Sequence, residues 1–79
     1  MNREQILVVV QRVVREETFK PELIISELTK SEDVPGWDSL AHTRIILGLE
    51  SALKKNIPIE ETYYATDVGE LITLIDGLT

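Results

Sequence analysis

Apolar residues recur every three or four positions in three separate segments of this chain, and this spacing restricts the fold more than any other feature. The first segment spans residues 3–17, the second spans residues 39–55, and the third follows Asp67. Spacings of three and four place side chains on one face of an α-helix, whereas strand residues alternate between two faces. The sequence therefore predicts an all-α protein.

Each of these predicted helices has an apolar stripe that we assign to the core. In the first helix the stripe consists of Ile6, Leu7, Val10, Val13 and Val14. In the second it consists of Ala41, Ile45, Ile46, Leu49, Ala52 and Leu53. In the last it consists of Val68, Leu71, Ile72, Ile75 and Leu78. Leu40 and Leu47 lie outside the stripe of the second helix, and we expect both to be exposed, as a surface for a partner.

The helix boundaries follow from capping and helix-breaking residues. Asn56 to Pro58 are expected to end the second helix, because asparagine tolerates a left-handed cap and proline prevents continuation. Residues 60–65 are expected to form a short third helix. Asp67 then caps the fourth helix, and Glu70, three residues later, completes a capping box.

Residues 18–37 are predicted to be a long connection between the first two helices. Pro35-Gly36 predicts a type II turn, since proline fits its first central position and glycine accepts the positive φ of its second. A short helical turn is expected around residues 22–28, and the anchors are Leu23, Ile24, Ile25 and Leu28. A connection of this length usually has a functional reason.

The 79 residues are enough for one domain, spanning 1–79. We predict a small antiparallel four-helix bundle with three longer helices, a short third helix and a long loop between helices one and two. Because the chain has no cysteine and only His42 as an imidazole, disulfides, thiolate metal sites and a histidine-based relay are not expected. We predict no metal site and no enzymatic activity.

The charge balance favours some partners over others. Fourteen acidic and eight basic residues give a net charge of −6, so a nucleic acid is a poor partner. The longest apolar run, Ile6 to Val10, is too short to span a bilayer, and no signal peptide is evident. We therefore expect a cytoplasmic protein without a membrane span, monomeric on its own.

Ser39 is the main candidate site residue because it follows a turn and opens the second helix. Asp38 precedes it at the N-cap, where a carboxylate accepts hydrogen bonds from the first free N–H groups. An anion attached to the Ser39 hydroxyl would lie at the positive end of the helix macrodipole. No neighbouring residue in the sequence resembles a base, so Ser39 is interpreted as an attachment point. The alternative is an ordinary helix-start serine.

The chain resembles acyl carrier proteins over nearly its whole length. The motifs that carry this resemblance are Asp38-Ser39-Leu40 at the start of the second helix, Ile45-Ile46-x-x-Leu49-Glu50 within it, Ile57-Pro58-x-Glu60-Glu61 before the third helix, and Thr66-x-Val68 with Ile72 at the fourth. Asp-Ser-Leu alone is a weak signal. Asp-Ser-Leu at mid-chain, at this distance from Ile-Pro-x-Glu-Glu in a short acidic chain, is a much more specific signal of the family. The stretch Gly36 to His42 is similar to discrete carriers of specialised pathways.

This resemblance implies a function that needs no catalytic residues. A separate phosphopantetheinyl transferase would attach 4′-phosphopantetheine to Ser39, and Asp38 would assist that transfer as well as cap the helix. The thiol of the arm would then hold an acyl group as a thioester. The second helix would dock acyl-activating or acyl-transfer enzymes, and the expected partner-binding residues are Leu40, Thr43, Arg44, Leu47 and Tyr63.

One departure from the family concerns charge. Typical fatty-acid carriers have an acidic second helix, whereas residues 38–55 contain three basic and two acidic residues, a net charge of +1. Because charge complementarity influences partner choice, we hypothesise a dedicated set of enzymes. An aminoacyl or peptidyl carrier, including a D-alanyl carrier, stays open as an alternative. An unmodified helical interaction domain that uses Leu40 and Leu47 is the alternative of another class.

Several residues near Ser39 have two interpretations. Trp37 is either a lid on the core or a ligand contact. His42 is either a buried, hydrogen-bonded histidine or a contact to the arm. Tyr63 and Tyr64 either line the exit of the arm or pack against the second helix. Lys54 and Lys55, with Arg44, are interpreted as a solvated face that also meets partners.

Overall fold

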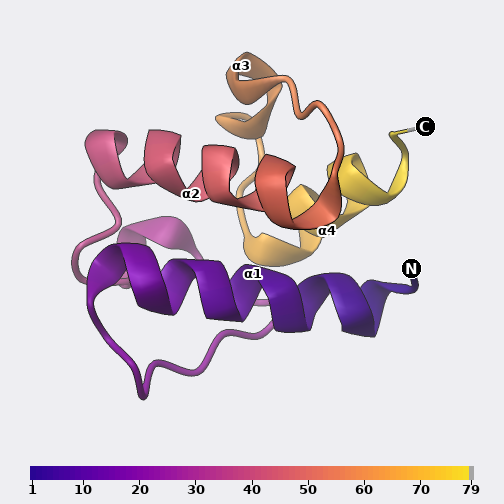
Figure 1. The fold of residues 1–79 in the computed structure, drawn as a ribbon. Helices are drawn as coiled ribbons and strands as arrows, with labels where there is room; N and C mark the ends of the chain where they lie inside the picture. The colour runs from indigo at the N-terminus through magenta and orange to yellow at the C-terminus, as the bar shows by residue number, and fades with distance from the viewer. Residues whose placement is uncertain (79) are drawn as a thin grey trace.

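The computed structural model describes residues 1–78. All of the regular secondary structure in these residues is helical. The elements are α1 (Arg3–Thr18), the 3₁₀ helix η1 (Ser31–Asp33), α2 (Ser39–Leu53), α3 (Ile59–Thr62) and α4 (Val68–Asp76). Figure 1 shows α1 and α2 side by side and running in opposite directions, and α4 also packs against α1. The prediction of three longer helices and a short third is confirmed for this part of the chain. None of the helices in it has the length and apolar character needed to cross a membrane.

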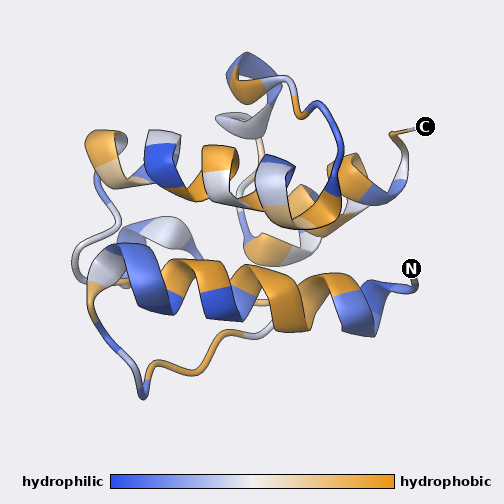
Figure 2. Ribbon diagram, in the orientation of Figure 1, coloured by the Kyte–Doolittle hydropathy of each residue, from blue (hydrophilic) through white to orange (hydrophobic). Residues whose placement is uncertain are grey.

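A single cluster of buried apolar side chains joins α1, α2 and α4. The predicted stripes supply most of it, and hydrophobic and hydrophilic stretches alternate along these helices in Figure 2. Leu7, Leu53 and Leu78 are only partly buried at its edge. The assignment of Ala52 to the core is wrong: this residue is exposed and borders a shallow groove between α1 and α2.

The second helix ends two residues earlier than predicted. Lys54, not Asn56, adopts the left-handed conformation, with φ of 55°, and its backbone N–H donates to the carbonyl of Glu50. The third helix is also shorter than the predicted 60–65, because residues 63 and 64 continue as a turn after Ile59–Thr62. Propensity alone did not identify these ends, since a lysine in the left-handed region is uncommon.

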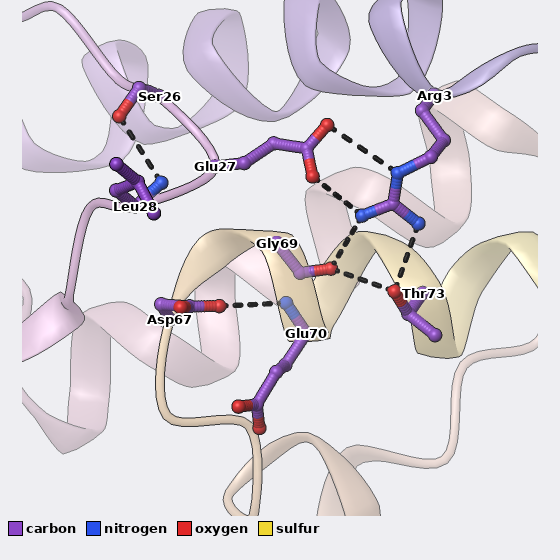
Figure 3. Close-up of polar contacts among 8 residues, drawn as sticks. All are labelled: Arg3, Ser26, Glu27, Leu28, Asp67, Gly69, Glu70 and Thr73. Atoms are coloured by element: carbon purple, nitrogen blue, oxygen red, sulfur yellow. Dashed lines mark hydrogen bonds and ion pairs between the residues drawn. The ribbon is translucent and has the colours of Figure 1, made fainter.

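The expected capping box at α4 is wrong in one of its two bonds. Asp67 caps the helix as predicted, accepting from the backbone N–H of Glu70 at 2.8 Å (Figure 3). The Glu70 carboxylate, however, accepts from the backbone N–H and the hydroxyl of Thr66, at 3.1 and 2.6 Å. In a capping box the Glu70 carboxylate would accept only from the backbone N–H of Asp67. Thr66 offers it two donors instead, a backbone N–H and a hydroxyl.

The long connection has no helix at residues 22–28, and its 3₁₀ turn lies later, at η1. Besides backbone hydrogen bonds in its turns, two of its backbone groups bind side chains of α1: Gln11 accepts from the N–H of Ile25 at 2.7 Å, and Arg15 donates to the carbonyl of Leu23 at 2.5 Å. Ile25 is buried as expected, but Ile24 and Leu28 are 80% and 83% exposed and are not anchors. Around Ile25 the backbone is extended and alternate side chains point outward, whereas Leu28 lies in a turn that the N–H of Thr29 closes on the Ser26 carbonyl.

The middle of the connection is fixed to the start of α4. The first two N–H groups of α4, from Val68 and Gly69, donate to the carbonyls of Thr29 and Glu27 at 2.8 and 2.7 Å. These are donors that a helix cannot satisfy internally. Arg3 of α1 completes the arrangement by binding the Glu27 carboxylate at 2.6 Å and the Gly69 carbonyl at 2.9 Å (Figure 3).

The predicted type II turn precedes α2. Gly36 has a φ of 90°, and the N–H of Trp37 donates to the carbonyl of Val34 at 3.1 Å, which closes the turn. The turn brings Asp38 to the start of α2.

Candidate functional site

Ser39 is the first residue of α2, and its side chain is exposed. Asp38 is the N-cap, and its carboxylate accepts from the backbone N–H of Ala41 at 2.8 Å. The expectation that Asp38 caps the helix is confirmed. The Ser39 hydroxyl therefore lies in the first turn of a 15-residue helix, at the end where the macrodipole is positive.

A cleft of about 300 Å³ borders Ser39. Four parts of the chain surround it: the end of the connection, the first turn of α2, the end of α3 and the start of α4. The lining residues are Ser31, Glu32, Trp37, Asp38, Ser39, His42, Thr62, Tyr63, Ala65, Asp67, Val68 and Leu71. Of these, Val68 and Leu71 belong to the buried core, so the cleft reaches from an apolar interior to the attachment candidate.

His42 connects three of these surrounding parts. Its Nδ1 accepts from the indole N–H of Trp37 at 3.0 Å, and its Nε2 lies 2.7 Å from the hydroxyl oxygen of Thr62. The Thr62 hydroxyl in turn donates to the carbonyl of Ile59 at 2.6 Å. His42 is only 9% exposed. The interpretation of His42 as a buried, hydrogen-bonded histidine is therefore confirmed.

Burial also disfavours the charged form of this imidazole. Desolvation lowers the pKa of His42 below its ordinary value, because the charged form loses its hydration. Both ring nitrogens already have partners inside the chain, so this imidazole has no free nitrogen to take a proton from Ser39.

Two aromatic side chains flank His42. The ring of Tyr63 lies with its centroid 4.5 Å from that of His42 at an interplanar angle of 34°, and the ring of Trp37 lies at 6.2 Å. Trp37 packs against the core and also lines the cleft. Tyr63 packs on His42 of α2, which was one of the two interpretations, and it also borders the cleft. Tyr64 is 83% exposed and is not among the lining residues.

The other predicted partner residues lie outside the cleft. Leu40 and Leu47 are 68% and 57% exposed, as expected. Thr43 is spaced three and four residues from them, so all three share one face of α2. Its hydroxyl donates to the carbonyl of Ser39 at 3.3 Å. Arg44 forms an ion pair with Glu17 of α1 at 3.2 Å.

The basic side chains of residues 38–55 are less available than the sequence indicated. Arg44 is paired with Glu17. The ammonium of Lys55 donates to the carbonyls of Ile75 and Leu78, at 3.4 and 3.3 Å, and so holds the end of α4. The interpretation of Lys55 as part of a solvated face is wrong, because two of the three basic groups in residues 38–55 bind elsewhere in the chain.

The structure also adds residues that sequence reasoning missed. Thr62 had no sequence signal as a partner of His42, since the two are twenty positions apart. Glu32 and Ser31 reach the cleft only because the connection folds back over it. Val68 and Leu71 could be recognised as core but not as the apolar end of a cleft. No group of three or more His, Cys, Asp or Glu side chains placed to hold a metal ion occurs within residues 1–78.

Comparison of the chain with models of protein families, with curated proteins and with solved structures returned no match. The function of the chain is therefore inferred from its own residues and from the geometry around Ser39.

Proposed function

We propose that this protein is an acyl carrier that holds its cargo as a thioester on a 4′-phosphopantetheine arm attached to Ser39. The observation that carries the proposal is the position of one hydroxyl. Ser39 is exposed, opens α2 directly after its cap, and borders a cleft that reaches the core. A buried Ser39 would have left a transferase no access to the hydroxyl.

The surroundings of Ser39 suit a phosphate-linked group. A phosphodiester on this hydroxyl would lie at the positive end of the α2 macrodipole, where an exposed anion is stabilised by roughly 0.3–1 kcal/mol. Asp38 holds the first turn in place through its bond to Ala41. The cleft of about 300 Å³ is at the lower end of the usual size of small-molecule pockets, so it offers room beside the arm for a small cargo.

The order of elements supports an acyl-carrier-like fold. The described chain has a long helix, a long connection, a second long helix that begins at the candidate serine, a short helix and a final helix. This order agrees with the resemblance based on Asp38-Ser39-Leu40 and Ile57-Pro58. The proposed assignment of the fold rests on both together.

The chemistry divides between the chain and its cofactor. When attached, the arm supplies a terminal thiol that forms the thioester. Attachment joins the Ser39 oxygen to a phosphorus of coenzyme A, breaks the pyrophosphate bond, releases the adenosine bisphosphate, and passes the hydroxyl proton to the transferase. The chain itself positions the hydroxyl and presents α2, so its residues need only bind and orient.

Intact mass after co-expression with a broad-specificity phosphopantetheinyl transferase tests this proposal. We expect the wild-type chain to gain the mass of one phosphopantetheine and Ser39→Ala to gain none. Ser51→Ala is the matched control, because Ser51 is an exposed serine on the same helix, and this variant should be modified fully. A wild-type chain that stays unmodified, or modification that survives in Ser39→Ala, would contradict the proposal.

A non-carrier function has one observation in its favour. Leu40 and Leu47 expose a large part of their apolar surface on one face of α2, which suits an unmodified interaction domain as well as a carrier that docks enzymes. The same mass measurement separates the two, since only the carrier requires the modification.

The identity of the cargo is a second question within the proposal. An acyl group is our primary assignment, and an aminoacyl or peptidyl group, including D-alanine, is the alternative. Incubating the holo form with acyl-activating and with amino-acid-activating enzymes and measuring the mass distinguishes them. We further propose a dedicated set of enzymes, because α2 lacks the acidic surface of typical fatty-acid carriers. Elongation of the acyl form by a general ketosynthase, as readily as that of a housekeeping carrier, would contradict this.

A further inference from the structure

A single imidazole links the parts of the chain that surround the cleft. The N–H of Trp37, from the connection, donates to Nδ1 of His42, on α2. Nε2 of the same ring contacts the hydroxyl of Thr62, on α3, and that hydroxyl donates to the Ile59 carbonyl. Trp37, His42 and Thr62 all line the cleft. The connection and α3 are thus both attached to α2 through one titratable group.

The hydrogen-bond partners leave only one protonation state for this ring. An indole nitrogen can only donate, so Nδ1 must carry no hydrogen to accept from Trp37. The single hydroxyl hydrogen of Thr62 is used on the Ile59 carbonyl, so Thr62 can only accept from His42. Nε2 must therefore carry the hydrogen. His42 is neutral, and its tautomer is determined by its neighbours.

We propose that His42 is an acid-sensitive latch whose neutral form holds Trp37 and α3 against α2, and whose protonation releases Trp37 and opens the cleft. Protonation adds a hydrogen to Nδ1, which then faces the indole N–H at a separation suited to a hydrogen bond. Two donors facing each other cannot form one, so the ring or the indole must move. Movement of either side chain changes the lining of the cleft beside Ser39.

The groups around His42 act on its charge in opposite directions. Tyr63, directly after α3, lies tilted against the ring, and the carboxylates of Glu32, Asp38 and Asp67 line the same cleft from the connection, the cap of α2 and the cap of α4. Those negative charges favour the protonated ring, whereas burial opposes it and lowers the pKa of His42. Neither ring nitrogen is bound to a carboxylate, so no ion pair compensates for protonation.

The latch exists in the chain itself, whether or not Ser39 is modified. Its use, however, rests on the proposed function: a neutral His42 keeps the cleft closed around the cargo end of the arm, and a protonated His42 exposes it. The chain would thereby shelter its thioester less well as the pH falls.

The composition makes this inference straightforward to test, because the chain has one histidine and one tryptophan. The experiment uses the full-length, unmodified chain labelled with ¹⁵N and titrated by NMR from pH 8 to pH 5. At pH 8 we expect a neutral ring whose hydrogen is on Nε2. As the pH falls, we expect the indole N–H resonance of Trp37 to shift with the same midpoint as the ring nitrogens of His42, and Trp37 fluorescence to change with them.

Two variants serve as controls. In His42→Asn the amide oxygen can still accept from Trp37 but does not titrate, so the shift of the indole resonance should disappear; any part that remains belongs to the carboxylates. In Trp37→Phe the opposing donor is gone, so the midpoint of His42 should rise. Should His42→Asn fail to fold, the Trp37→Phe titration still decides, because it measures His42 directly.

Three results would overturn the latch: a hydrogen on Nδ1 at pH 8, an indole resonance that does not move while His42 titrates, or a His42 midpoint that is unchanged in Trp37→Phe. None of them depends on modification of Ser39, whereas the mass measurement does not depend on His42. Failure of the latch and failure of the carrier function are therefore distinguishable.

Discussion

The core between α1, α2 and α4 and the wall of the cleft formed by α3 are held together in different ways. In the core, Ile45, Leu49 and Ile72 are fully buried among other apolar side chains. The short α3 packs only Ile59 against the edge of this core and is attached to α2 by the hydrogen bond between His42 and Thr62, and in Figure 1 it lies beyond α2, on the side away from α1. Apolar packing does not respond to pH, whereas protonation of Nδ1 of His42 breaks its bond from Trp37 and leaves the Nε2 bond to Thr62 in place. The stable part of the molecule is thus separate from the part that we expect to move.

The largest expected effect comes from removing a core side chain. Leu49→Ala should lower the free energy of unfolding by about 2–5 kcal/mol, through lost burial and the cavity left behind, which is a large share of the stability of a small domain. Leu47→Ala is the matched control on the same helix; because Leu47 is 57% exposed, its effect should stay within about 0.5 kcal/mol. Urea unfolding measures both. Equal losses would remove the distinction between the core and the exposed face of α2.

A smaller effect is expected where the connection meets α4. A Cβ on Gly69 would lie 2.9 Å from the backbone carbonyl oxygen of Glu27, so the connection must shift. Overpacking of this kind costs about 1–3 kcal/mol, and the better helix propensity of alanine offsets up to about 1 kcal/mol. Gly69→Ala should therefore destabilise the chain by roughly 1–2 kcal/mol. In Gly77→Ala, where the nearest atom is 3.5 Å away, urea unfolding should show no such loss.

The smallest effect is the dependence of stability on pH. Burial lowers the pKa of His42 in the folded chain, so the unfolded chain binds the proton first, near pH 6.5. Above that pH, His42 should cause no change in the free energy of unfolding. Below it, the free energy of unfolding should fall as the pH decreases toward the pKa of His42 in the folded chain. Urea unfolding at pH 7.5, 6.5 and 5.5 measures this pH dependence, and His42→Asn should remove the part that His42 contributes.

The carboxylates contribute in a separate range. The hydrogen bond from Arg3 lowers the pKa of Glu27, and the hydrogen bonds from Thr66 lower the pKa of Glu70. A carboxylate whose pKa is lowered on folding stabilises the fold at pH values above its unfolded pKa. This stabilisation is lost only as the pH falls below that unfolded pKa, in more acidic solution than the range in which His42 acts. A loss of stability between pH 6.5 and 5.5 that persists in His42→Asn would show that the cleft wall is not the pH-sensitive region.

The main helices and the position of Ser39 could be predicted because their signals are local. The apolar spacing of α1, α2 and α4 identifies the core, and the Pro35-Gly36 turn with Asp38 identifies the start of α2. Each of these signals depends on residues within a few positions of one another. The prediction that Leu40 and Leu47 are exposed succeeded for the same reason.

The cleft and the end of α2 could not be predicted because they depend on contacts that are distant in sequence. The His42–Thr62 bond joins residues twenty positions apart, and the bonds from α4 to the Glu27 and Thr29 carbonyls span about forty. Lys54 is left-handed although Asn56, two residues later, has the better local preference for that conformation. Tertiary contacts prevailed over propensity at each of these positions.

The two carbonyls that cap α4 have a further consequence for how the chain could vary. By fixing Glu27 and Thr29, they divide one long tether into two short ones, each with its own closure entropy. Extra residues near Pro21, which is exposed and precedes this attachment, would lengthen only the tether remote from Ser39. Extra residues between Thr29 and Trp37 would lengthen the tether that delivers α2 to the cleft. Natural length variation should therefore accumulate in the first tether and be rare in the second.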